Sequence, residues 1–468
     1  MTDSAMEGKA QAGDGSPGLV TRFLRLFTDI RQGEAPKALL LALNVFLILL
    51  AYYILKAIRE ALILTGKDAR TKSYLGAAQA ILFIFVVKAF CKLASRVPRH
   101  VLITWVTLFF ISNLAIFFFM DMAGVPIGTM GIIFFIWVGI FNYMIVAQFW
   151  GFANDLYTDE TGKRIFPLIA VGATAGALVG SGIAKWLFMV LGSSYLMMLV
   201  SAAILCFCIV LTIVIHKREV RKAAERAAMG RPGLESAKKA QEQPLKKGGG
   251  FSLVFKRRYL LYIALLIFVY NFINATGEFM ISETQVRVAQ RAIASGAAGG
   301  LSMEQYMGRA MADYQILTNL LALLIQLFLV SRIFRWVGIG GALLFLPVLV
   351  LGGYGYASFG ASLILLRWIK SAENGTDYSL MNTTKAALFL KTSREEKYKA
   401  KAAIETFFVR GGDTLAAILV FLGTTFLALK IERFASVNVV AILVWIFLCF
   451  LIIREYKMIK ASPETPQA

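Results

Sequence analysis

Long runs of apolar residues alternate with short polar stretches along most of the chain. Each run has about 20 residues, the length that an α-helix needs to cross a bilayer. We therefore predict an all-α polytopic membrane protein with twelve transmembrane helices. The apolar segments are Ala38–Ile58, Tyr74–Leu93, Val101–Met120, Gly128–Gly151, Phe166–Val190, Tyr195–Ile215, Tyr259–Ile281, Tyr314–Ile333, Val337–Ala357, Ser362–Asn382, Ala402–Leu429 and Val437–Ile453.

A polar stretch between the sixth and seventh segments divides the chain into two sets of six. This division predicts a 6 + 6 major-facilitator-type fold, in which two halves face each other across a site near the middle of the membrane. The predicted parts are a disordered tail with a basic amphipathic segment (1–33), an N-terminal half (34–215), a basic cytoplasmic linker (216–258), a C-terminal half (259–455) and a C-terminal tail (456–468).

The chain is 58% hydrophobic and only 16% charged, yet its formal net charge is +21. Lys and Arg gather in the first, last and alternate polar segments, and thirteen of them lie in 216–258. Because cytoplasmic loops carry such an excess, both ends of the chain are predicted to lie in the cytoplasm. The asymmetry explains the net charge without nucleic-acid binding.

The tenth segment carries charges inside its apolar frame. Arg367, Lys370, Glu373 and Asp377 recur every three or four residues, which places them on one face of a helix. Charged residues at bilayer depth face a protein interior or a water-filled cavity. Further polar residues within apolar segments or directly after them are Lys56, Arg59, Glu60, Lys88, Lys185, Asn271, Asn274, Glu278, Arg410 and Asp413.

Two interpretations of these charges are open. They could pair internally, as Arg59 with Glu60 or Lys370 with Glu373, and simply hold the helices together. Basic residues outnumber acidic ones inside the predicted helices, however, and Arg and Lys are the residues that bind phosphate or carboxylate. The surplus favours a small anionic substrate. Aromatic residues that could stack on such a substrate are Tyr52, Tyr53, Phe149 and Tyr270.

Other chemistry has little support in the sequence. Both histidines, His100 and His216, lie at segment ends, and no His, Cys and carboxylate cluster has metal-ligand spacing. We predict neither a metal nor a cofactor, and we expect no enzyme activity. A membrane-embedded transferase is the remaining alternative, and it would need a positioned base or metal.

Small residues recur every four positions in the fifth segment, in the run IAVGATAGALVGSGIAKW. This spacing is typical of helices that pack closely together. We interpret Gly172, Gly176, Gly180 and Gly182 as a packing face.

Three stretches suggest a family: LKAIREALILTG in the first segment, QFWGFANDLYTDETGKRIFPLIAVGATAGALVGS, and YSLMNTTKAALFLKTSREEKYKAKAAIETFFVRGGD. Together they resemble the ATP/ADP translocases of plastids and obligate intracellular bacteria, and most closely the bacterial members. The resemblance implies a carrier of the major facilitator plan in a bacterial inner (cytoplasmic) membrane. Val138–Gly139 and Ala386 stand where that family has acidic residues.

The resemblance also implies site residues. The R-D-T-K-D run of the family falls on residues 56–60, with Lys56 at its arginine, Arg59 at its lysine and Glu60 at its second aspartate. Glu278 matches the glutamate of the seventh helix, and further lysines match at positions 385, 399 and 401. The candidate substrate-binding residues are Lys56, Arg59, Glu60, Lys88, Asn274, Glu278, Arg367, Lys370, Glu373, Asp377, Lys385 and Lys401.

The favoured hypothesis is a secondary transporter that moves a nucleotide such as ATP or ADP by alternating-access exchange. The alternative is a proton-coupled carrier of another organic anion, namely a metallophore, a sugar phosphate or a lipid headgroup. The expected partners are the small anionic substrate and the lipid bilayer, and we predict a monomer.

Overall fold

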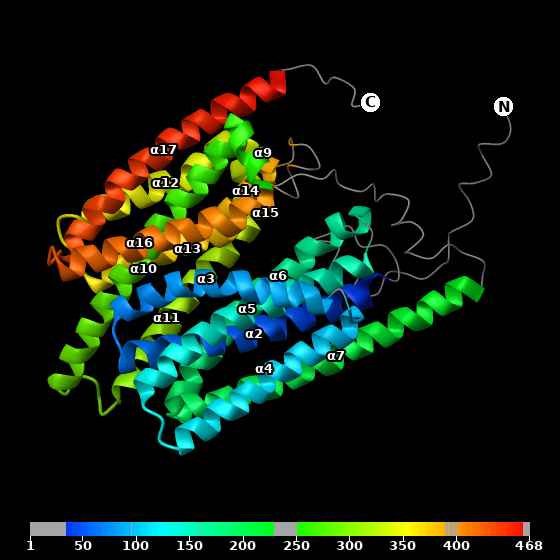
Figure 1. The fold of residues 1–468 in the computed structure, drawn as a ribbon, viewed down its shortest axis with the longest axis horizontal. Helices are drawn as coiled ribbons and strands as arrows, with labels where there is room; N and C mark the ends of the chain where they lie inside the picture. Colours follow the sequence, from blue (N-terminus) through cyan, green and yellow to red (C-terminus); the bar gives the residue numbers. More distant parts are fainter. Residues whose placement is uncertain are drawn as a thin grey trace.

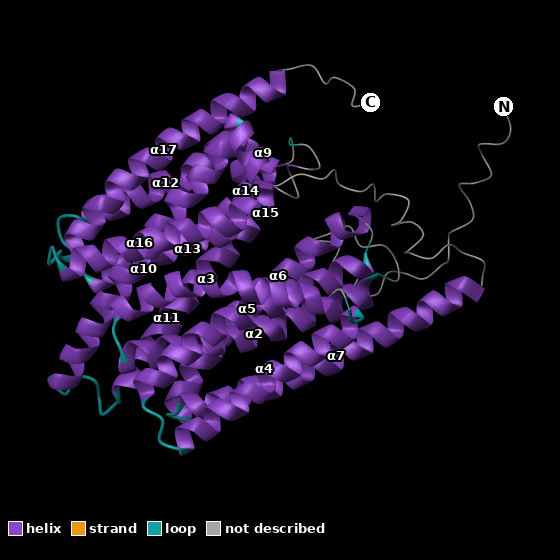
Figure 2. Cartoon of the chain, in the orientation of Figure 1, coloured by secondary structure: helices purple, strands orange, loops and turns teal. Residues whose placement is uncertain are grey.

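The computed structural model describes residues 34–94, 96–157, 159–228, 250–389, 392, 396 and 400–461. Every regular element in this part is helical (Figure 2). The N-terminal helices are α2 (Ala35–Gly66), α3 (Ala69–Ala94), α4 (Arg99–Met122), α5 (Ile127–Leu156), α6 (Asp159–Val190) and α7 (Ser194–Ala228). The predicted tail and amphipathic segment at 1–33 lie outside the described residues.

The C-terminal part begins with the short helix α9 (Gly250–Lys256) and continues with interrupted helices. They are α10 (Arg258–Ala294), α11 (Met303–Leu324), η1 (Ile325–Leu329), α12 (Val330–Ala357), α13 (Leu363–Thr376), η2 (Asp377–Met381), α14 (Asn382–Leu388), α15 (Lys401–Ala403), η5 (Ile404–Phe408), α16 (Val409–Thr425) and α17 (Ile431–Ala461). The three η elements are π-helical turns, which often occur at functional sites.

Nine of the described helices are long and apolar enough to cross a membrane, with α11 to α12 counted as one. The twelve predicted segments fall on helical residues except at a few of their ends, and the α13 region is not among the nine. The criterion allows few charges, and the α13 region holds the charged face of the tenth segment. Large apolar side chains such as Trp105, Phe119 and Phe447 are exposed, as a lipid-facing surface requires.

Helix ends differ from the predicted ones. α7 continues to Ala228, inside the predicted linker, and α17 continues to Ala461, past the predicted start of the C-terminal tail. α2 and α10 also extend beyond their apolar runs. Hydrophobicity marks the part of a helix that lipid or protein buries, whereas backbone hydrogen bonding continues through the charged turns that follow.

Buried side chains form two main clusters. One gathers apolar residues between positions 38 and 215 together with Ala312. The other spans 254–452 and includes Ile63, Leu64, Ala69 and Phe135. In Figure 1, α2 and α4–α7 form one group and α10, α12, α16 and α17 another, with α3 and α11 between them.

The packing of α6 on α2 depends on small residues. A Cβ atom placed on Gly172 would lie 2.7 Å from the carbonyl oxygen of Ala42, and one on Gly180 would lie 2.6 Å from that of Leu50. Only a residue without a side chain lets the backbones approach this closely. The interpretation of this run as a packing face is confirmed for these positions, whereas Gly182 faces open space.

Helices α3 and α11 join the two groups. α11 packs on α6 and α2 on one side and on α13 on the other, and α3 packs on α16, α10 and α5. The contact between α6 and α11 includes an ion pair of Lys185 with Asp313 at 2.7 Å and a hydrogen bond from Asn319 to Ser181 at 3.1 Å. Lys185 therefore has a carboxylate partner, which reduces the predicted surplus of cations.

Candidate functional site: a charged cavity between the helix groups

A polar cavity of about 260 Å³ lies where the two helix groups meet. α2, α3, α10, α11, α13 and η2 all contribute to its wall. The residues that line it are Tyr52, Lys56, Arg59, Glu60, Lys72, Tyr270, Asn274, Glu278, Met311, Tyr314, Gln315, Asn374, Asp377 and Tyr378. Six of the twelve predicted site residues are in this set: Lys56, Arg59, Glu60, Asn274, Glu278 and Asp377.

Glu60 on α2 contacts two of the cations that line the cavity. Its buried carboxylate accepts from Arg59 Nε at 3.1 Å and Nη2 at 2.5 Å, and Lys72 Nζ lies 2.7 Å from its other oxygen. Two cations thus share one carboxylate. The predicted pairing of Arg59 with Glu60 is confirmed, but it leaves one positive charge in excess at this point.

Glu278 is the corresponding acid on α10. Tyr314 Oη and Asn374 Nδ2 each donate to its Oε1 at 3.0 Å. The ammonium groups of Lys72 and Lys370 lie 3.7 Å and 3.9 Å from its oxygens, at the outer limit of an ion pair. Lys72 therefore lies between acids of the two helix groups, Glu60 on α2 and Glu278 on α10.

Lys56 differs from the other cations of the cavity. Among the residues that the structure describes, its ammonium group has neither a hydrogen-bond acceptor nor an ion-pair partner. It lies over the face of the Tyr53 ring, with Nζ 5.0 Å from the centroid. A cation held in this way can still bind an incoming anion.

Lys370 and Glu373 lie in the wall behind the cavity. The Lys370 side chain is fully buried, 3.0 Å from Glu373 Oε1, and donates to Asn274 Oδ1 at 2.9 Å. Tyr354 Oη donates to Glu373 Oε2 at 2.8 Å. Neither charge lines the cavity. This pair follows the interpretation in which buried charges hold helices together.

The remaining predicted residues are placed differently. Lys385 donates to Asp377 Oδ1 at 3.0 Å and so touches a cavity residue without lining the cavity itself. Lys401 lies 3.6 Å from Glu405 on its own helical stretch, away from the cavity. Arg367 is half-buried and lines neither the cavity nor its neighbour, and its Nε has no hydrogen-bond partner among the described residues. The side chain of Lys88 lies outside the described residues, as does Lys399.

A second cavity of about 300 Å³ adjoins the first and shares Arg59, Lys72, Asn274 and Glu278 with it. Its other polar residues include Gln79 on α3 and Arg410 and Asp413 on α16. The Arg410 guanidinium lies 3.3 Å from Asp413 and 4.6 Å from the Phe83 ring centroid. The two spaces form a corridor whose shared wall carries Arg59, Lys72 and Glu278.

Sequence reasoning missed several lining residues. Lys72 precedes the second apolar segment by two residues, yet α3 starts at Ala69 and carries it into the interior. Tyr314 and Asn374 carry no charge, and so a pattern of charged residues does not include them. The signal for Lys72 was its spacing from Gly76 and Gln79, which puts all three on one helix face.

Two of the four aromatic residues named from the sequence lie at the first cavity. Tyr52 and Tyr270 line the first cavity, as do Tyr314 and Tyr378. Tyr53 is buried next to Tyr52, and Phe149 lies in another part of the N-terminal helices. Tyr52 also stacks on Phe141, with ring centroids 6.5 Å apart.

Comparison with known proteins agrees with this geometry. Residues 130–359 match the family described as TLC ATP/ADP transporter. The match confirms the resemblance. The segment starts in α5 and ends just after α12, and it therefore includes Glu278, Tyr314 and the α6–α11 contact.

Several relatives with curated names are similar over longer stretches. ADP,ATP carrier protein 1 of Chlamydia muridarum is 24% identical, over 83% of this chain and 82% of its own length. ADP,ATP carrier protein 1 of Chlamydia trachomatis is 25% identical, but the match spans only 55% of that protein and 59% of this chain. The plastidic ATP/ADP-transporter of Solanum tuberosum is 27% identical over 37% of this chain and 32% of its own.

Solved structures share the fold at low sequence identity. The nucleoside transporter NupG has a TM-score of 0.58 at 16% identity, covering 90% of this chain and 99% of its own. A POT family peptide transporter has a TM-score of 0.62 at 12% identity, covering 92% and 99%. These similarities establish a multi-pass, all-helical fold of the major facilitator type, and they say nothing about the substrate.

Proposed function

We propose that this protein exchanges ATP and ADP across a bacterial cytoplasmic membrane by alternating access. The named relatives are ADP,ATP carriers, which supports this substrate class and does not favour a metallophore, sugar phosphate or lipid headgroup as cargo. The observation that carries the proposal is the corridor between the helix groups, where Lys56 has no partner among the described residues and Arg59 and Lys72 share Glu60.

In this proposal the chain crosses the membrane twelve times with both ends inside. Residues 34–215 and 259–455 are the two halves, 216–258 is the linker, and 1–33 and 456–468 are the terminal parts. The central position of the cavity supports the division, because carriers of this plan bind substrate near the middle of the membrane.

The phosphates would bind to Lys56, Arg59 and Lys72. Glu60 pairs with two of these cations, Arg59 and Lys72, and phosphate oxygens can replace that carboxylate as hydrogen-bond acceptors. The tyrosines of the first cavity supply flat apolar faces for the base. Arg410 would then meet the end of a longer phosphate chain in the second cavity, which gives this corridor a means to distinguish substrates by phosphate count.

Binding would also loosen the contact between the halves. Lys72 ties Glu60 of α2 to Glu278 of α10 at what is the outer side of the cavity in the proposed topology. A phosphate that pairs with Lys72 leaves Glu60 and Glu278 without the cation between them. The two carboxylates then repel each other, which favours separation of the halves. A ligand changes a conformational equilibrium only through such differences in contact between states.

A transport assay tests the proposal. Purified protein in proteoliposomes loaded with ATP should take up labelled ADP, whereas empty liposomes should take up far less. Labelled sugar phosphates and citrate serve as comparison substrates under the same conditions. Uptake of ADP that does not depend on internal nucleotide would contradict exchange, and absence of any nucleotide uptake would contradict the substrate class.

A further inference from the structure

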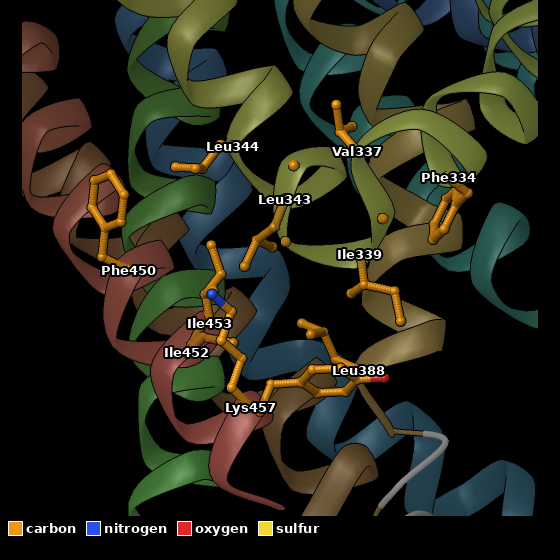
Figure 3. Close-up of a pocket in the computed structure, with 14 residues that line it drawn as sticks. Phe334, Val337, Ile339, Leu343, Leu344, Leu388, Phe450, Ile452, Ile453 and Lys457 are labelled. Carbon is orange, nitrogen blue, oxygen red and sulfur yellow. The ribbon is translucent and has the colours of Figure 1, made fainter. Parts of the chain in front are cut away.

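A cavity of about 820 Å³ shares no lining residue with the charged corridor. It lies between the start of α12 and the end of α17, with Leu388 of α14 at its base (Figure 3). Its volume is that of a site for a sizeable organic molecule, for which roughly 300–1,000 Å³ is usual. No residue of the proposed nucleotide site takes part in it.

A break in α12 creates this groove. Gly338 has φ +65°, a left-handed conformation that favours glycine, and it interrupts the helix between Val337 and Ile339. Gly340 and Gly341 follow and present no side chains, so that α12 leaves a gap beside α17. The other side chains that face this gap are almost all apolar: Phe334, Val337, Ile339, Leu343, Leu344, Leu388, Phe450, Ile452 and Ile453.

One cation reaches into the apolar groove. Figure 3 shows the Lys457 side chain running back along α17, with its nitrogen pointing toward Ile453 and Leu343. No Asp or Glu is among the lining residues, and no carboxylate pairs with Lys457 in the described part of the chain. Lys457 is itself an exposed residue, so that its ammonium group is accessible to an anion that also covers the apolar surface.

The surroundings agree with a membrane interface. Arg335 and Trp336 are exposed and directly precede Val337, and the Trp336 side chain is 72% exposed. Tryptophan at the edge of an apolar surface is typical of the headgroup region, and basic residues mark the cytoplasmic side. A basic pocket between helices on that side is the kind of site that holds an anionic lipid headgroup.

We propose that this groove binds one anionic phospholipid of the cytoplasmic leaflet. Its phosphate lies on the Lys457 ammonium group, and an acyl chain follows Phe334, Leu344 and Phe450 into the gap that the α12 break leaves. The proposal does not depend on which substrate the corridor carries. Lys457 has no carboxylate partner in the described part of the chain, and the lipid phosphate would supply an anion for it. The acyl chain would fill the apolar volume next to Lys457.

Native mass spectrometry of the delipidated protein in detergent tests this site. Titration with phosphatidylglycerol should give a first bound lipid at lower concentration than phosphatidylcholine. Lys457→Gln should weaken the first phosphatidylglycerol about fivefold, the loss expected for one basic contact, and should leave phosphatidylcholine unchanged. Lys430→Gln, an exposed lysine at the other end of the α16–α17 pair, is the matched control and should behave like the wild type.

A second pair of variants tests the apolar part. Ile453→Trp fills the groove and should abolish the tight first lipid, whereas Leu443→Trp on an exposed face of the same helix should not. Equal lipid binding in Lys457→Gln and wild type, or in Ile453→Trp and Leu443→Trp, would overturn the proposal. Full competition by glycerol 3-phosphate would also overturn it, because the site would then recognise free phosphate without a chain.

Discussion

At the scale of single residues, the cavity and its wall contain two kinds of charge. Lys370 and Glu373 form an ion pair in a fully buried setting, where Lys370 also donates to Asn274 and Tyr354 donates to Glu373. Lys56 lines the cavity without a partner among the described residues. The first kind holds helices in place, because burying a charge alone is costly. The second kind is available to a ligand.

Substitution of Lys56 tests whether a cavity charge without a partner binds the ligand. Lys56→Gln should weaken ATP binding about tenfold or more, since a hydrogen bond to a charged group contributes about 1.5–3 kcal/mol. Lys401→Gln, whose lysine pairs with Glu405 away from the cavity, is the control and should bind as the wild type does. Isothermal titration in detergent gives both dissociation constants. Equal affinities in the two variants would remove Lys56 from the site.

Substitution of Lys370 tests whether a buried, paired charge stabilises the fold. Lys370→Met leaves Glu373 buried without its cation, which should destabilise the protein by about 3–5 kcal/mol. Lys370→Met combined with Glu373→Gln should recover most of that loss, because no bare charge remains. The thermal unfolding midpoint in detergent reports both effects. A double variant no more stable than the single one would show that the pair does not act as a unit.

At the scale of elements, helix packing fixes where the cavity residues lie. α6 approaches α2 through glycines, and α2 carries Lys56, Arg59 and Glu60 to the cavity. A displacement of α6 would therefore move the wall that holds three of the cavity charges. The same helix also contacts α11.

Two glycines of α6 with different surroundings separate the effect of packing from that of helix propensity. Gly180→Ala places a Cβ 2.6 Å from the Leu50 carbonyl oxygen and should destabilise the protein by about 1–3 kcal/mol. Gly182→Ala meets nothing within 4 Å and should be neutral or slightly stabilising, since alanine favours helix. Thermal unfolding of both variants is the measurement, and equal midpoints would contradict the packing role of this face.

The helices and six cavity residues could be predicted because each leaves a local signal. Apolar length marks a membrane helix, and a charge inside it marks an interior face. Lys72 left no such charge signal, since it lies before the apolar run and reaches Glu60 and Glu278 only in the folded chain. The pairing of Lys185 with Asp313 and the separation of Lys401 from the cavity likewise depend on which helices meet. The spacing of residues in the sequence predicts which side chains share a face of one helix, but not which helices pack against each other.

At the scale of the whole molecule, Lys72 connects what we propose to be the two halves. It lies 2.7 Å from Glu60, 3.7 Å from Glu278 and donates to Ser282 at 2.8 Å. The first acid belongs to α2 and the other two partners to α10. A single ammonium group therefore contributes to closing the cavity on the proposed outer side, and its loss should change how often that side opens.

Cysteine labelling measures this opening. In a variant without native cysteines, Ser73→Cys places a thiol in the second cavity, where a membrane-impermeant maleimide should react faster from outside as the outer side opens more often. Lys72→Gln should raise the labelling rate from outside severalfold, because repulsion between Glu60 and Glu278 is no longer screened. Lys67→Gln, an exposed lysine in the preceding loop, should leave the rate unchanged. If both variants label at the rate of the parent, Lys72 does not hold the halves together, and closure depends on the apolar and α6–α11 contacts instead.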